Sequence, residues 1–139
     1  MLPKLLVTIG IIFYAVVVPV LEINDTHVFN PGWEAHARLH EVWQLFTNTA
    51  IGLFSVWLVW TRGDVRLPSL LTLFVTGGFL LSYWLRAGYG GSMVLSDGTE
   101  NTIFGMNLGL FAYTLAILMA AVAVVMERRE RLAAAPVNR

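Results

Sequence analysis

The chain has 139 residues, of which 57% are hydrophobic and 13% charged, and its nine basic and nine acidic residues give zero net charge. A soluble domain typically carries about 25% charged residues, so the composition excludes an ordinary soluble protein. The sequence lacks the dense cluster of Lys and Arg with interleaved aromatic residues that would indicate nucleic acid as a partner. The lack of cysteine excludes disulfides and thiolate chemistry.

The apolar residues fall into four blocks, each close to the about 20 residues with which a helix crosses a bilayer. Continuous apolar runs of this length lack the alternation of a membrane β-barrel. The sequence therefore predicts an all-α integral membrane bundle of four transmembrane helices, forming one domain over 1–139. The helices are expected at about 4–22, 31–60, 67–86 and 102–127, followed by a cytoplasmic tail at 128–139.

The first of these helices follows Lys4 and resembles a secretory signal peptide in length. No small-x-small cleavage site follows it, because Pro19, Leu21 and Glu22 occupy the positions where one is expected. The segment is therefore predicted to remain as a membrane helix.

The second helix is predicted to begin at Asn30-Pro31, with Asn as N-cap and Pro at the first helical position. Continued to Trp60 it has about 30 residues, or about 45 Å at 1.5 Å per residue. This length exceeds the hydrocarbon core of about 30 Å, so its first two turns should lie in the outer interface. Trp33 and Trp43 suit that position.

Polar residues of this helix share one face. At about 100° per residue, one sector of about 120° contains a polar stripe. The stripe consists of His36, His40, Gln44, Thr47, Asn48 and Ser55. Glu34, Arg38 and Glu41 are expected to point away from it, towards the interface. Lipid cannot satisfy polar groups, so the stripe must face the bundle interior or a water-filled cavity.

Other segments place polar side chains at the same outer end of the bundle. These are Glu22, Asp25 and His27 after the first helix, Tyr83 and Arg86 on the third, and Asn107 on the fourth. The Gly-rich connection between the last two helices is expected to act as a mobile cover. The inner half has almost no polar groups outside its loops, which favours an outward-facing pocket over a channel.

The basic residues give the orientation. Seven of the nine lie near the N-terminus, in the second connection and in the tail, whereas only Arg38 and Arg86 lie in the other two connections. The positive-inside rule then places both termini in the cytoplasm. We expect an integral protein of a bacterial inner membrane.

Two chemistries remain open at the outer end. His36 and His40 could act as acid and base, with Glu22 or Asp25 setting their protonation. Alternatively, two histidines one helical turn apart, joined by His27, could bind a divalent transition metal such as zinc, iron or copper.

The leading hypothesis is a pocket for a small lipophilic ligand of isoprenoid, sterol-like or quinone-like chemistry. An enzyme of this kind would be an isomerase or cyclase that works by proton transfer and needs no cofactor. The expected ligand-binding residues are His27, Trp33, Gln44, Asn48, Tyr83, Arg86 and Asn107. A further alternative is a non-catalytic subunit of a larger membrane complex, with the stripe packed against a partner. Assembly into a homo-oligomer is also open.

The stretch from Thr26 to His40 reads THVFNPGWEAHARLH. It resembles a THxFNPxWxxHARxH signature of small four-helix membrane proteins of unknown function in bacteria and fungi. More distantly, the chain resembles the emopamil-binding-protein (EXPERA) superfamily, which includes sterol isomerases and sterol-binding proteins. The sterol isomerase of that superfamily has a His and a Glu one helical turn apart in an intramembrane site. Here His36 and His40 take those positions and the acidic member is missing, so the resemblance implies only architecture and substrate class.

Overall fold

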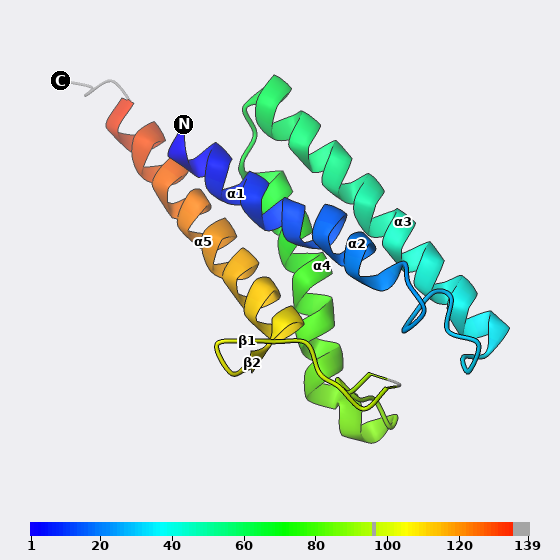
Figure 1. Ribbon diagram of the computed structural model, residues 1–139. Coiled ribbons are helices and arrows are strands. Elements are labelled where there is room, and N and C mark those ends of the chain that lie inside the picture. The colour runs from blue at the N-terminus through cyan, green and yellow to red at the C-terminus, as the bar shows by residue number, and fades with distance from the viewer. Residues whose placement is uncertain (96, 135–139) are drawn as a thin grey trace.

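Four long helices make up most of the chain (Figure 1). The computed structural model describes residues 1–95 and 97–134. Its four helices that are long and apolar enough to cross a membrane are Leu2–Glu22, Ala35–Arg62, Arg66–Gly88 and Leu108–Ala134. The all-α class and the four predicted spans are thereby confirmed as helices of suitable length and composition.

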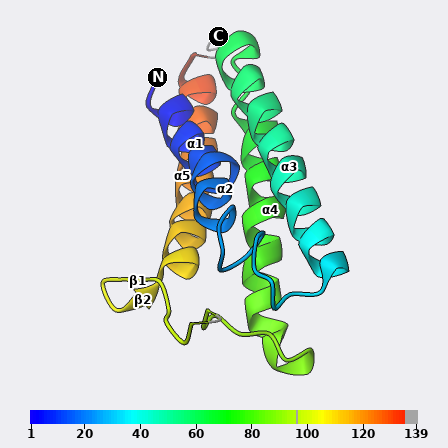
Figure 2. The ribbon, with the colours of Figure 1, turned by 45° about the vertical axis from the view of Figure 1, so that its right-hand side comes forward.

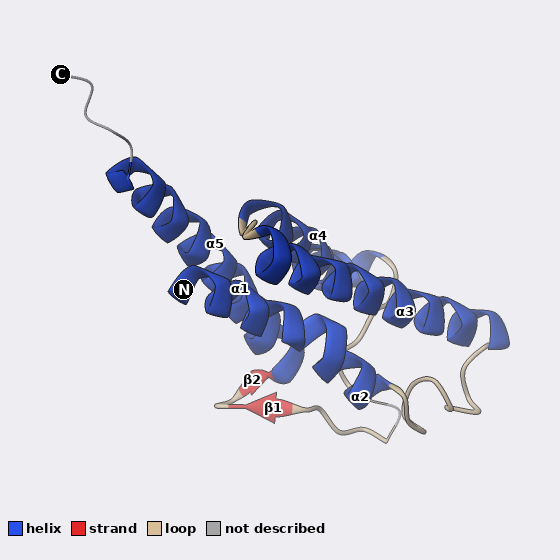
Figure 3. Cartoon of the chain, turned by 90° about the horizontal axis from the view of Figure 1, so that it is seen from above, coloured by secondary structure: helices blue, strands red, loops and turns tan. Residues whose placement is uncertain are grey.

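Each long helix except the last is assembled from more than one helical type. The first comprises α1 (Leu2–Ile12), the π-helical η1 (Phe13–Val17) and α2 (Val18–Glu22). The second comprises α3 (Ala35–Trp57) and the π-helical η2 (Leu58–Arg62), and the third α4 (Arg66–Leu85) and the 3₁₀ turn η3 (Arg86–Gly88). The antiparallel strands β1 (Thr102–Ile103) and β2 (Met106–Asn107) precede α5 (Leu108–Ala134), as Figure 3 shows.

Successive helices run in opposite directions, so the connections gather at two ends (Figure 2). The start of α1, the turn at 63–65 and the last turns of α5 lie at one end, called the termini end below. The segments 23–34 and 89–107 lie at the other, called the loop end. Packing is uneven, because α5 lies along both α1 and α4, whereas α3 packs mainly on the first helix. From the turn at 63–65, α3 and α4 diverge towards the loop end (Figures 1 and 2).

The first helix and α3 meet at Ala15. Pro19 has no N–H, so the α-helical donor to the carbonyl of Ala15, four residues earlier, is missing. The Thr49 hydroxyl donates to it at 3.1 Å. One turn further along α3, Gly52 lies so close that a Cβ there would be 2.3 Å from the Ala15 Cβ. A proline, a hydroxyl and a glycine thus define this crossing.

Polar side chains are also buried deeper in the bundle. The hydroxyls of Tyr14, Ser55 and Thr72 lie together, and each of the three residues is fully buried. At the termini end, Glu127 of α5 is 7% exposed and accepts from Arg66 Nε at 3.1 Å and from Arg131. This ion group ties α4 to α5 at the termini end.

The predicted start of the second helix at 31 is wrong. Asn30 serves a turn instead of capping a helix: its Oδ1 accepts from Gly32 N–H at 2.9 Å, and its Nδ2 donates to the Thr26 carbonyl at 3.1 Å. The chain stays extended at Glu34, and α3 begins at Ala35. The first two helical turns that were expected in the interface are therefore partly replaced by this turn.

The predicted bounds of the last helix, 102–127, are also wrong. Residues 102–107 form the hairpin, and Asn107 caps α5 by accepting from the N–H groups of Gly109 and Leu110 at 2.9 and 3.3 Å. The helix then continues through the ion group to Ala134, so most of the predicted tail is helical. The end of that tail, 135–139, lies outside the described residues.

Replacing Gly52 with Ala should destabilise the bundle, because the new methyl group would overlap Ala15 and approach Ile11 Cγ2 at 3.2 Å. Overpacking of this kind typically costs about 1–3 kcal/mol. Unfolding by SDS titration in mixed micelles measures the loss. Gly78→Ala is the matched control, since its Cβ meets no heavy atom within 4 Å; equal stability of the two variants would contradict the close crossing.

Candidate functional site

Two adjoining cavities open at the loop end. The first, of about 670 Å³, lies between α3 and α4 and is called the α3–α4 cavity. The second, of about 650 Å³, lies between α2, α3 and α5 and is called the α2–α5 cavity. They share Gln44, Phe79, Ser92, Met93 and Tyr113, so we treat them as one chamber. Each volume lies within the about 300–1,000 Å³ of ligand pockets.

The α3–α4 cavity has a polar rim and an apolar depth. Gln44 and Asn48 line it from α3, and Tyr83 and Arg86 from α4 and η3. Ile51, Phe74 and Val75 lie nearer the middle of the two helices and provide the apolar part of the wall. The cavity therefore offers one region to a polar group and another to hydrocarbon.

The α2–α5 cavity contains the acidic groups. Glu22 at the end of α2 and Glu41 on α3 both line it, together with His27, Trp33 and Asn107. Apolar side chains of the first helix and α5 complete the wall, among them Phe13, Val17, Leu108 and Ala112. Two carboxyl groups and an imidazole thus face the same mostly apolar space.

His27 and Glu22 form a direct pair. His27 Nε2 lies 2.8 Å from Glu22 Oε2, and the two side chains are only 18% and 25% exposed. The Trp33 ring meets the imidazole edge-on at 5.5 Å between centroids. Burial lowers the pKa of His27 from its ordinary value of 6.5, because the protonated ring loses water.

The turn at 24–30 fixes the histidine from its other side. Asn24 Oδ1 accepts from the Thr26 N–H at 2.8 Å and lies 2.7 Å from the Thr26 hydroxyl, which in turn lies 2.8 Å from His27 Nδ1. A hydroxyl has one proton to donate. If the Thr26 hydroxyl donates its proton to Asn24 Oδ1, it accepts a hydrogen bond from a protonated His27 Nδ1. In a neutral imidazole Nε2 then carries no proton, so it accepts a hydrogen bond from a protonated Glu22. The pair can therefore hold its shared proton on either partner.

Arg86 is oriented by its own helix. Its Nη1 donates to the Tyr83 carbonyl at 2.8 Å, and its guanidinium lies 3.9 Å from the centroid of the Tyr83 ring. Of the three ion pairs in the described part of the chain, none involves Arg86. The positive charge therefore lines the α3–α4 cavity without a carboxylate beside it.

The loop between α4 and the hairpin lies over both cavities. Ser92 and Met93 line both, and Val94 and Leu95 line the α2–α5 cavity. The loop is tied back to the end of α4 by Gly91 N–H, which donates to the Arg86 carbonyl at 2.8 Å, and by the Tyr89 hydroxyl, which donates to the Ser82 carbonyl at 2.9 Å. The segment expected as a cover is therefore part of the chamber wall.

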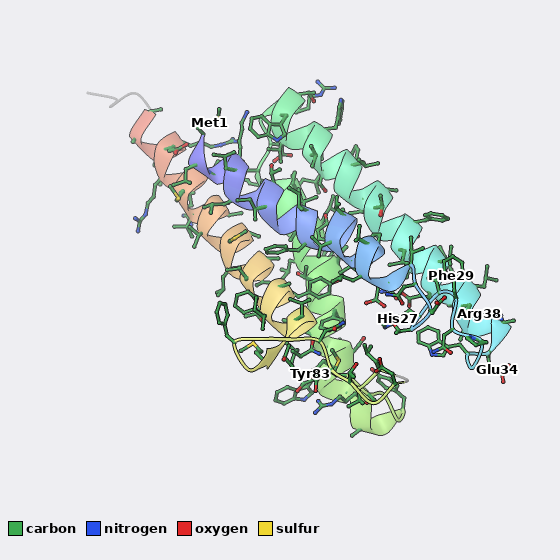
Figure 4. All side chains as sticks on the ribbon, viewed as in Figure 1. Met1, His27, Phe29, Glu34, Arg38 and Tyr83 are labelled. Carbon is green, nitrogen blue, oxygen red and sulfur yellow. The ribbon has the colours of Figure 1, made fainter. Side chains whose placement is uncertain are left out.

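The predicted catalytic pair lies elsewhere. His36 and His40 are exposed, line neither cavity, and contact each other with 2.9 Å between their Nε2 atoms. Figure 4 shows why: Glu34 and Arg38 mark a tip of α3 that projects beyond the bundle, away from Tyr83 on α4. The polar stripe is thus divided: Gln44 and Asn48 line the chamber, whereas His36 and His40 do not.

The three histidines do not form a metal centre. Within residues 1–95 and 97–134, no three His, Asp or Glu side chains are placed to hold a metal ion together. His27 is bound to Glu22, whereas His36 and His40 lie at the tip of α3. Asp25 is exposed and lines neither cavity.

One orientation expected from the helical wheel is wrong. Glu41 was expected to point away from the pocket, but it lines the α2–α5 cavity. A helical wheel shows which residues share a face of an isolated helix. Because α3 is tilted, the face that contacts the rest of the bundle changes along its length. Tyr113, buried on α5 beside Phe79, lines both cavities.

Comparison with known proteins gives no relative. No family model matches the chain, and neither the curated proteins nor the solved structures include a match that shows a relationship. The resemblances given by the THVFNPGWEAHARLH stretch therefore stay predictions.

The burial of His27 predicts a pH dependence of stability. Its folded pKa lies below 6.5, so on acidification the unfolded chain binds the proton first. The contribution of His27 to the free energy of unfolding should accordingly be constant above pH 6.5 and should decrease as the pH falls below it. His27→Gln should weaken this dependence, as measured by SDS unfolding at several pH values. Parallel curves for the wild type and His27→Gln would contradict the assignment.

Proposed function

We propose that this chain is an integral membrane protein whose chamber binds a small lipophilic molecule at the loop end. One observation carries the proposal: Glu22, His27 and Glu41 face a space that is otherwise mostly apolar. Ionisable groups inside a membrane bundle are costly and usually functional. A ligand of isoprenoid, sterol-like or quinone-like chemistry would match the apolar wall and use the few polar groups for orientation.

We infer that a ligand enters the chamber from the side, between α3 and α4, which both line the α3–α4 cavity. The two helices diverge towards the loop end (Figure 2), and the α3–α4 cavity lies between them. A molecule dissolved in the bilayer would thus reach Gln44 and Asn48 without first crossing water. This arrangement favours a lipophilic ligand over a water-soluble one.

Proton transfer is the chemistry that the wall offers to such a ligand. The Glu22–His27 pair takes the acid/base role expected of His36 and His40, because it lines the chamber and they do not. A proton moved to one carbon of a bound olefin by this pair, and removed from another carbon by Glu41, would isomerise the double bond. Such a step needs no metal and no redox group.

Native mass spectrometry of the protein released gently from detergent tests the binding proposal. Gly78 lines the α3–α4 cavity, and a Cβ there meets no heavy atom within 4 Å, so the indole of Gly78→Trp is expected to occupy the cavity. We expect an organic adduct on the wild type and its loss from Gly78→Trp.

Gly77→Trp is the matched control, because Gly77 is adjacent in sequence but lines neither cavity. It should keep the adduct. An adduct on all three proteins would place the ligand outside the chamber, and bare protein throughout would favour a non-catalytic subunit. A metal-sized mass increment lost on replacing His36 and His40 with Ala would favour the metal hypothesis instead.

The orientation with both termini in the cytoplasm has its own test. The chain has no cysteine, so single cysteines can be introduced without background. Glu34→Cys at the loop end should react with a membrane-impermeant maleimide in intact spheroplasts, because Glu34 is exposed and caps no helix through its side chain. Leu132→Cys, 66% exposed at the termini end, should react only after the membrane is broken. The reverse pattern would overturn the positive-inside assignment.

A further inference from the structure

The charges of the chamber are separated. The acidic residues Glu22 and Glu41 line the α2–α5 cavity, whereas Arg86 lines the α3–α4 cavity. Gln44 and Tyr113 are common to the two cavities and lie between these regions. One compartment therefore disfavours an anion, and the other presents an unpaired positive charge to whatever occupies it.

Arg86 has donors to spare. A guanidinium carries five N–H groups in a planar fork. One of them is bound to the Tyr83 carbonyl, and the ring of Tyr83 holds the group in place from one face. No carboxylate within the described residues pairs with it. Such a fork matches the oxygens of a carboxylate or a phosphate.

The opposite wall supplies further donors. Gln44 and Asn48, one turn apart on α3, line the same cavity. The side-chain hydrogen bonds that α3 makes within the described chain involve other residues, namely the exposed histidines and Thr49. Two amide groups and a guanidinium thus line one cavity, and in a membrane these groups need a partner.

The geometry points to a single-chain amphiphile with an anionic head group, a carboxylate or a phosphate monoester, as the ligand of the chamber. Its head group binds Arg86, Gln44 and Asn48. Its hydrocarbon chain packs on Ile51, Phe74 and Val75, which lie one to three turns deeper on the same two helices. This inference rests on the proposed function and adds the charge of the ligand to it.

Paired photoactivatable probes test the inference. The full chain in phosphatidylcholine nanodiscs is labelled with a palmitic acid that carries a mid-chain diazirine and a terminal alkyne, or with the alcohol of the same chain. We expect saturable labelling near Phe74 and Val75, with the acid preferred over the alcohol by about tenfold, as charge-assisted hydrogen bonds predict. Dodecyl phosphate should compete for the site, whereas inorganic phosphate should not, since the chain is part of the ligand.

Arg86→Gln should lower labelling by the acid to about the level of the alcohol. Labelling by the alcohol that remains saturable in this variant shows that the chamber is still folded. Arg86→Lys should keep part of the preference. Arg62→Gln is the control, because Arg62 is exposed at the termini end against Trp57. Equal labelling by acid and alcohol in the wild type, or a preference that survives Arg86→Gln, would overturn the inference but leave the chamber as a binding site. Absence of saturable labelling by both probes would overturn the proposed function itself.

Discussion

The carbonyl oxygen of Ala15 fixes the position of α3, and the rest of the loop end follows from that position. Pro19 removes the α-helical donor of this carbonyl, and a hydroxyl from a neighbouring helix donates to it inside the bundle. Thr49 provides it, and Gly52 permits the close approach. Because α3 is held against the first helix and not along α4, the two helices separate beyond this point and leave space between them.

That space becomes chemically specific through a short turn. Asn24, Thr26 and Asn30 use their side chains to fold the segment after α2 back on itself, which brings His27 onto Glu22. The same turn delays the start of α3. A residue pair that lies five positions apart in the sequence thereby faces the chamber, while the more conspicuous pair at the tip of α3 faces outward. Local hydrogen bonds, and not helical periodicity, therefore determine that His27 is the histidine that faces the chamber.

The sequence predicts the helices better than the site for a physical reason. Apolar length reports directly on the cost of placing backbone in lipid, so the four spans can be read from composition alone. The orientation of Glu41 depends on the tilt of α3, which is set by Ala15 and Thr49 on different helices, and no pattern local to Glu41 contains that information. Asn30 and Asn107 show a related ambiguity, because an Asn serves a turn or a helix cap equally well and only the second of them caps a helix.

The buried hydroxyls of Tyr14, Ser55 and Thr72 have a consequence for how a ligand would enter and leave the chamber. Ser55 lies one turn beyond Ile51 on α3, and Thr72 precedes Phe74 and Val75 on α4, so the packed layer closes the chamber towards the termini end. For a ligand bound as proposed, entry and exit would then use the same opening. A bound molecule would block the next one until it leaves, and the leaflet next to that opening would supply the site.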